Sequence, residues 1–131
     1  MKKLLPLLLS ALMLTACSPS GGTSPNTYRR ITSDEAAAMM EQETDYIILD
    51  VRRPDEYAAG HIPNAINVPN ESIGTDEIPE LPNKDQLIMV YCRSGRRSKE
   101  AAEKLVKLGY TNIVEFGGIL DWKGETVTGQ K

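Results

Sequence analysis

The chain has 131 residues and carries 15 Lys and Arg against 18 Asp and Glu, a formal net charge of −3. That length fits one domain, and a hydrophobic content of 40% is ordinary for a soluble globular fold. The acidic balance and the scarcity of aromatic residues disfavour nucleic-acid binding, which needs a basic footprint or a stacking platform. Two cysteines and one histidine are too few for a disulfide scaffold or a cysteine-rich zinc site.

The first residues have the layout of an export signal. Lys2 and Lys3 are followed by an apolar run over 4–14, which is shorter than the roughly 20 residues that a helix needs to cross a bilayer. A basic start, a short apolar core and then small residues predict a secretory signal. The alternatives are a buried N-terminal helix, an uncleaved anchor or a cut elsewhere.

The apolar run ends in Leu14-Thr15-Ala16-Cys17, which resembles the bacterial lipobox. The resemblance implies that 1–16 is a lipoprotein signal peptide, removed before Cys17, and that Cys17 is then acylated. Residues 17–27 are rich in Ser, Pro and Gly and predict a flexible tether. We therefore expect an exported protein, anchored by lipid to a bacterial membrane on its periplasmic side or at the outer cell surface.

Apolar runs mark the predicted strands of the folded domain, which we place at 28–131. Continuous runs predict buried strands at 46–51 and 86–91, and weaker runs predict strands at 28–32, 65–68 and 112–116. Helical patterns separate these strands. Ser33 is the predicted N-cap of the first helix, and an apolar stripe predicts another helix over 98–108, with Gly109 as its stop. The alternation predicts an α/β fold with a mainly parallel sheet, whose ligand site lies at the carboxyl ends of the strands.

Cys92 lies at such a place, between a buried strand and a helix. It opens a short basic loop made of Arg93, Ser94, Gly95, Arg96 and Arg97. A short loop that enters a helix turns its backbone N–H groups inward and forms an anion-binding concavity. The helix N-terminus and the arginines favour a thiolate, since cysteines at helix N-termini have pKa values lowered to about 3.5–7.5. The pattern predicts a reactive cysteine beside a small anion site, and the alternative is a buried, inert cysteine at a strand end.

The run Cys92-Arg93-Ser94-Gly95-Arg96-Arg97-Ser98 resembles the active-site loop of single-domain rhodanese sulfurtransferases. The segments Leu49-Asp50-Val51-Arg52 and 60–69 resemble the family's upstream signature, and Gly117-Gly118 with Trp122 resemble its closing segment. The match extends over 28–131. It implies a rhodanese-like fold, a central, mainly parallel five-stranded sheet with helices on both faces.

The same resemblance implies a reaction. Cys92 attacks the outer sulfur of a donor such as thiosulfate, releases sulfite and keeps the sulfur as a persulfide, which a thiol or cyanide then removes. This is covalent catalysis in two steps and implies ping-pong kinetics. Backbone N–H groups at 93–97 would stabilise the anionic sulfur. The partners implied are a small sulfur-containing anion, a thiophilic acceptor and the membrane, with no metal, organic cofactor or nucleic acid.

Several residues near this loop have open roles. Asp50 and Arg52 are candidates for supporting the loop or for binding the donor. Glu56 stands where some two-domain rhodaneses active on thiosulfate carry an arginine, so an acid facing the pocket would repel a dianion. It can instead be exposed and paired with Arg52 or Arg53. We expect His61 to be structural.

Three alternatives to sulfur transfer remain. One is a membrane-tethered rhodanese module without enzymatic activity that binds a partner protein. Another is a redox role of Cys92, for which the mature chain offers no second thiol once Cys17 is acylated. A phosphatase is the third, but the position where such enzymes place their phosphate-gripping arginine is Ser98 here.

Overall fold

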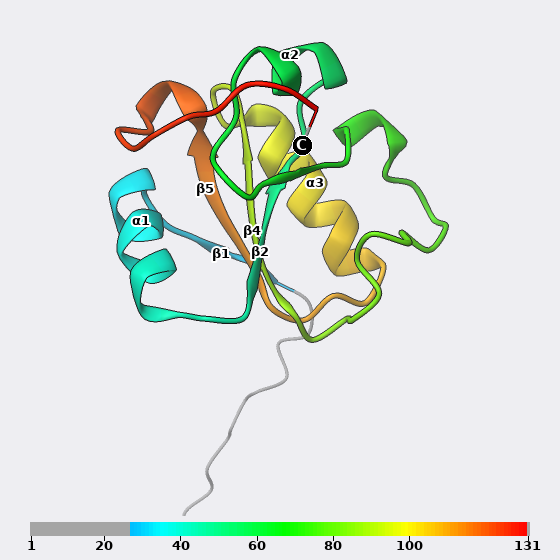
Figure 1. The fold of residues 1–131 in the computed structure, drawn as a ribbon. Coiled ribbons are helices and arrows are strands. Elements are labelled where there is room, and N and C mark those ends of the chain that lie inside the picture. The colour runs from blue at the N-terminus through cyan, green and yellow to red at the C-terminus, as the bar shows by residue number, and fades with distance from the viewer. Residues whose placement is uncertain (1–26, 131) are drawn as a thin grey trace, which may run out of the picture.

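A computed structural model describes residues 27–130 of the chain. The signal peptide predicted over 1–16, Cys17 and the predicted tether up to residue 26 lie outside these residues. Within the described part, no helix has the length and apolar character needed to span a bilayer. The described residues form a β-sheet with helices on both of its faces (Figure 1).

All strand pairs in the sheet are parallel, and the strand order is β1-β5-β4-β2-β3. The five strands are β1 (Arg29–Arg30), β2 (Tyr46–Asp50), β3 (Ile66–Asn67), β4 (Leu87–Cys92) and β5 (Ile113–Gly118). The two-residue strands lie at the edges, and every residue of the central strand β4 is buried. Continuous apolar runs form such central strands because both of their faces are covered. The predicted five-stranded parallel sheet is confirmed.

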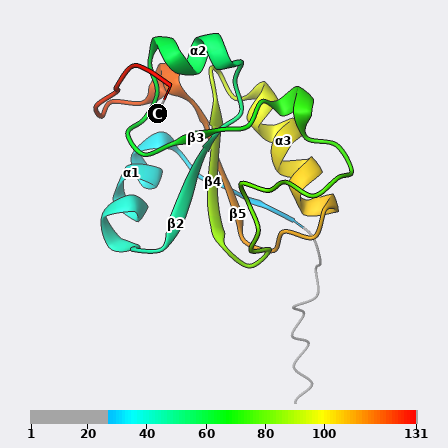
Figure 2. The same cartoon turned by 45° about the vertical axis from the view of Figure 1, so that its right-hand side comes forward.

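The helices lie on opposite sides of this sheet, as Figures 1 and 2 show for α1 (Ser33–Gln42) and α3 (Arg96–Lys107). The short helix α2 (Pro54–Ala59) lies beyond the carboxyl ends of the strands (Figure 1). Two 3₁₀ turns, η1 (Asn70–Ser72) and η2 (Ile119–Asp121), follow β3 and β5.

Alternation along the central strand divides the core into two parts. Leu87, Met89 and Tyr91 belong to the cluster on the α1 side, whereas Ile88, Val90 and Cys92 belong to the cluster that contains the apolar stripe of α3. Successive side chains of a strand point to opposite faces, so the strand sends Tyr91 and Cys92 into different environments. The final residue of β4 therefore faces the helix that follows it.

Some element boundaries differ from those predicted. The N-cap of α1 is Thr32 and not Ser33, because the Thr32 hydroxyl accepts the Glu35 N–H at 3.0 Å while the Glu35 carboxylate accepts the Thr32 N–H at 2.9 Å. That reciprocal pair is a capping box, which needs an acid three residues after the hydroxyl. Helix α3 begins at Arg96, two residues earlier than predicted, and α2 was not predicted. Gly109 follows α3 with φ of +101°, which confirms its role as the stop.

Candidate active site

Cys92 lies at the junction of β4 and α3. It is the last residue of the strand, not the first of the loop, and its side chain is 1% exposed. The Gly95 N–H donates a hydrogen bond to Sγ at 2.9 Å. Gly95 is the N-cap of α3 with φ of +117°, a left-handed conformation that favours glycine. The sulfur therefore accepts a backbone N–H at the positive end of a helix dipole, where negative charge is stabilised.

The predicted basic loop is shorter than expected, because Arg96 and Arg97 already belong to the first turn of α3. The side chains of Arg93, Ser94 and Arg96 are exposed, and Arg96 lies 4.0 Å from the Glu100 carboxylate. Arg97 is half-buried. Among the described residues, the N–H that donates to the sulfur belongs to the backbone of Gly95 and not to an arginine side chain.

Arg97 is paired with Glu56 of α2. Its two terminal nitrogens donate to the Glu56 carboxylate at 2.7 and 3.1 Å. Glu56 also accepts the Arg53 N–H at 3.1 Å, while the Arg53 guanidinium lies 3.9 Å away. The hydrogen bonds from Arg97 lower the pKa of Glu56 to about 2, and the same bonds raise the pKa of Arg97. The main partner of Glu56 is therefore neither of the two arginines suggested by the sequence, and Arg97 is not a free cation.

Asp50 and Arg52 form a buried ion pair at the end of β2. Asp50 is fully buried, and the Arg52 Nη2 lies 2.8 Å from its carboxylate. The same nitrogen donates to the Gly60 carbonyl at 2.6 Å, and the Tyr91 hydroxyl donates to Asp50 at 2.7 Å. Burial opposes the charge of Arg52, but the hydrogen bonds and charge of Asp50 outweigh it and raise its pKa. Burial, and then the charge of Asp50, raise the pKa of Tyr91. This network ties β2, β4 and the end of α2 together.

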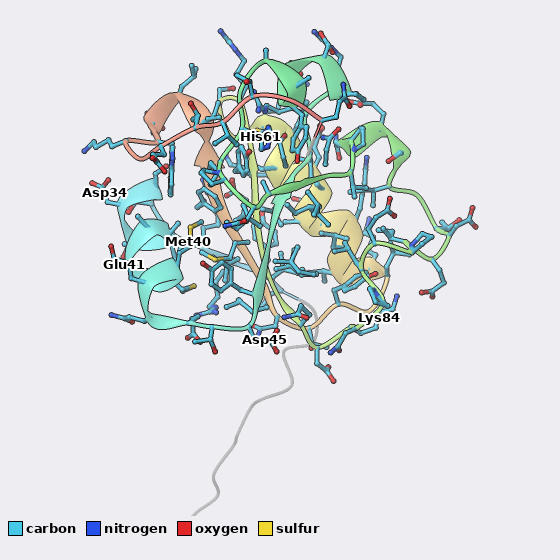
Figure 3. The ribbon with its side chains drawn as sticks, in the orientation of Figure 1. Asp34, Met40, Glu41, Asp45, His61 and Lys84 are labelled. Atoms are coloured by element: carbon cyan, nitrogen blue, oxygen red, sulfur yellow. The ribbon has the colours of Figure 1, made fainter. Side chains whose placement is uncertain are left out.

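His61 lies in the interior near α2, at the opposite end of the sheet from Asp45 and Lys84 (Figure 3). Its ring stacks on Tyr57 with centroids 3.7 Å apart, and Nδ1 lies 2.8 Å from the Tyr57 carbonyl. Its backbone pairs with Val127 through hydrogen bonds of 2.8 Å in both directions. These contacts give His61 the structural placement expected from the sequence.

Ser98, which contacts the sulfur, and Glu115, the partner of Ser98, were not identified from the sequence as residues of the site. The Ser98 hydroxyl of α3 lies 3.4 Å from the Cys92 Sγ, and it donates to the Glu115 carboxylate of β5 at 2.6 Å. Glu115 is 1% exposed, although burying a carboxylate costs several kcal/mol unless it is well paired. The sequence did carry a signal, because Glu115 is a lone acid inside the apolar run predicted as a strand.

The arrangement suits nucleophilic chemistry at sulfur. A buried sulfur accepts a backbone N–H and contacts a hydroxyl, and an anion in this position is stabilised by the helix start. Among residues 27–130, no group of three or more His, Cys, Asp or Glu side chains could hold a metal ion.

The sequence was compared with those of known proteins. Residues 32–125 match the family model for the rhodanese-like domain. The chain is 37% identical over 73 residues to the thiosulfate sulfurtransferase PspE of Escherichia coli, which covers 56% of this chain and 70% of that one. It is 36% identical over 93 residues to a sulfurtransferase of Allochromatium vinosum, covering 70% of this chain and 85% of that one.

Solved structures agree. An E. coli rhodanese with anions superposes with a TM-score of 0.59 at 34% identity, covering 64% of this chain and 99% of that one. A rhodanese-related protein from Thermoplasma volcanium superposes with a TM-score of 0.64 at 32% identity, covering 76% and 98%. The chain therefore belongs to the rhodanese-like domain family. Within it, the chain is a rhodanese-type sulfurtransferase, and these matches give no support to a module that only binds a partner.

Proposed function

We propose that this sulfurtransferase carries sulfur as a persulfide on Cys92. The observation that carries the proposal is the Gly95 N–H, which donates to the Cys92 sulfur at the start of α3. The same N–H and the helix dipole would stabilise both a thiolate and a persulfide anion. No metal or organic cofactor takes part in the proposed cycle.

The proposed cycle has two displacements at sulfur. In the first, the Cys92 thiolate attacks the sulfane sulfur of the donor, a new S–S bond forms, and the donor's S–S bond breaks. Its electron pair leaves with sulfite when thiosulfate is the donor. In the second, a thiolate or cyanide attacks the outer sulfur, and the electron pair of the broken bond returns to Cys92. One covalent intermediate, the Cys92 persulfide, is formed in the first half and consumed in the second, so the kinetics should be ping-pong.

The donor is proposed to be a small anion with a sulfane sulfur, such as thiosulfate. Two relatives support this class: one is named a thiosulfate sulfurtransferase, and one solved relative is described as a rhodanese with anions. In this chain Arg97 is engaged by Glu56, which leaves the exposed side chains of Arg93 and Arg96 to attract the donor. Their charge would act mainly on the encounter rate, since exposed charges steer ligands more than they hold them.

Mass analysis of the full chain tests the proposal. Reduced protein is incubated with thiosulfate, alkylated and digested with trypsin, and the peptide 85–93 is weighed with Cys92→Ser as the control. We expect a gain of one sulfur atom (about 32 Da) on this peptide, reversed by cyanide and absent from the variant. If neither thiosulfate nor an organic persulfide adds sulfur to Cys92, the persulfide cycle is wrong.

We also propose that the chain is exported and anchored by lipid on Cys17. The support is the basic start, the short apolar run and the Leu14-Thr15-Ala16-Cys17 motif. Cells that express the full chain and are fed labelled palmitate should transfer the label to the protein, which should sediment with membranes. Cys17→Ser should lose the label. A wild-type chain that stays unlabelled would exclude the anchor.

A further inference from the structure

We propose that Ser98 and Glu115 form a buried proton relay to Cys92, in which Ser98 is a catalytic residue at the sulfur and Glu115 a positioning residue that acts through it. The relay rests on the proposed persulfide cycle. Its geometry is a chain of two contacts, 3.4 Å from Sγ to the Ser98 Oγ and 2.6 Å from that oxygen to the Glu115 Oε2. The three residues come from β4, α3 and β5, and all are buried.

The single proton of the Ser98 hydroxyl fixes the direction of the chain. Three acceptors lie within reach: the Glu115 Oε2 at 2.6 Å, the Gly95 carbonyl at 3.1 Å and the Gly117 carbonyl at 3.2 Å. The shortest of these contacts is with the carboxylate, and a bond to an ionised acceptor is also the strongest. The hydroxyl therefore donates to Glu115, and a lone pair of its oxygen is left to accept the thiol proton of Cys92.

The surroundings of Glu115 leave part of its charge uncompensated. Oε2 also accepts the Gly117 N–H at 2.8 Å, and Oε1 accepts Arg30 Nε of β1 at 3.2 Å. Arg30 is mostly exposed, so water screens its charge, whereas Glu115 itself has almost no contact with water. From α3, the charge of Arg97 acts on Cys92, but that arginine is neutralised by its own partner on α2. A proton that reaches Oε2 would relieve the cost of a buried negative charge.

The proton balance of the relay is closed in each half of the cycle. As the Cys92 thiolate forms for its attack, the S–H bond breaks and the proton passes to the Ser98 oxygen, while the Ser98 proton passes to Glu115. Sulfite leaves with the electron pair of the donor's S–S bond, and the buried charge moves from the carboxylate to the persulfide. When the acceptor removes the outer sulfur, the electron pair returns to Sγ and the two protons move back. No oxidant, reductant or metal is required.

The test uses single-turnover persulfide formation with thiosulfate in the full chain. We expect Ser98→Ala and Glu115→Gln each to slow the step by about 100-fold or more, the lower end of the range that a general base contributes, at an unchanged half-saturating thiosulfate concentration. The double variant should be no slower than either single variant, because residues that act as one unit are not additive. Ser98→Thr keeps a hydroxyl and should retain most of the rate.

Ser33→Ala is the matched control, because Ser33 is also buried and contacts a β5 carbonyl, that of Phe116, at 3.4 Å. It should react at the wild-type rate. The pH profile separates the relay from a structural effect. Without the relay the thiol proton must go to solvent base, so the rate of Ser98→Ala should rise with pH more steeply than that of wild type.

The outcomes separate the relay from the persulfide cycle. If wild type forms the persulfide and both single variants react within twofold of it, the relay is wrong and the cycle stands. Multiplicative losses in the double variant, or a pH profile unchanged in Ser98→Ala, would also overturn it. If wild type forms no persulfide with any sulfane donor, the cycle itself fails. Thermal unfolding identifies a variant that loses its rate by misfolding. In that case the rates of Ser98→Thr and Ser98→Ala are compared, and equal rates in the two folded variants would overturn the relay.

Discussion

Two buried carboxylates, Asp50 and Glu115, occupy corresponding places on opposite faces of the sheet. Asp50 ends β2 and bonds to Tyr91, which faces α1, whereas Glu115 lies near the end of β5 and bonds to Ser98 of α3. Both side chains are almost fully buried. Their partners differ: Asp50 has a guanidinium that is itself buried, while the guanidinium that reaches Glu115 is mostly exposed.

The two carboxylates therefore have different roles: Asp50 supports the structure, and Glu115 belongs to the proposed reactive centre. Asp50 accepts hydrogen bonds from the Arg52 backbone, the Arg52 side chain and Tyr91, so its charge is fully matched and its geometry is fixed. A satisfied buried network rigidifies the structure around it. The charge of Glu115 is compensated only in part. Its carboxylate accepts a hydrogen bond from the Ser98 hydroxyl, whose proton can move toward it. A buried charge that is incompletely compensated is unfavourable for folding, and such charges cluster at functional sites. Here Ser98 links the charge of Glu115 to Cys92.

The largest effect is expected from breaking the Asp50 network. Arg52→Met leaves the Asp50 carboxylate buried without its counter-charge, and removing one partner of a buried pair costs about 3–5 kcal/mol of the free energy of unfolding. Unfolding in denaturant measures this change. Arg53→Met is the matched control, because Arg53 is exposed, its hydrogen-bond partner Asp55 is also exposed and Glu56 lies 3.9 Å away, and it should unfold close to the wild-type midpoint. Equal losses in the two variants would contradict the assignment of Arg52 as the counter-charge.

A substitution where the end of β5 contacts the loop after Cys92 should reduce activity. A Cβ at Gly118, the last residue of β5, would overlap the Arg93 carbonyl and lie 2.6 Å from the Ser94 nitrogen. Gly118→Ala must therefore displace the loop that follows Cys92, and a misplacement of about 1 Å costs roughly 100-fold in rate. Steady-state sulfur transfer measures the loss.

The control for this change is Gly74→Ala, where an added Cβ meets no atom within 4 Å and activity should be unchanged. Gly118→Ala protein that transfers sulfur at the wild-type rate would show that the loop tolerates the displacement. The rate would then be less sensitive to the position of this loop than the close contacts at Gly118 indicate.

The pairing of Glu56 with Arg97 predicts a smaller effect that depends on pH. The pKa of Glu56 falls from its ordinary 4.5 to about 2, so the stabilisation is present above pH 4.5 and is lost as the pH falls toward 2. Glu56→Gln should be less stable than wild type at pH 7 by about 2 kcal/mol, the range for a hydrogen bond to a charged group. The two stabilities should converge near pH 2.

Denaturant unfolding across pH measures this convergence, and the exposed Glu80→Gln serves as the control. The control should follow wild type at every pH. A difference between wild type and Glu56→Gln that persists unchanged at pH 2 would mean that the carboxylate charge is not its source.

Much of this fold could be predicted, because long apolar runs and turn residues act locally. The central strands and the position of Cys92 at the carboxyl ends of the strands follow from such patterns. Helix α2 could not be predicted, since six residues are too few to show a period. The side-chain contacts of the site could not be predicted for another reason. Glu56 and Arg97 are 41 residues apart in the sequence, and Ser98 and Glu115 are 17 apart. Only the packing of separate elements brings such pairs together.

The strand order also sets when the site can be complete during synthesis. Strand β1, near the start of the described chain, pairs with β5, the last strand, which also supplies Glu115 and the glycines that contact the loop. A nascent chain that ends between residues 93 and 112 would contain Cys92 but would lack these neighbours and the partner of β1. Distant pairings of this kind form late in folding. The ribosome must therefore deliver almost the whole domain before the sulfur centre is enclosed.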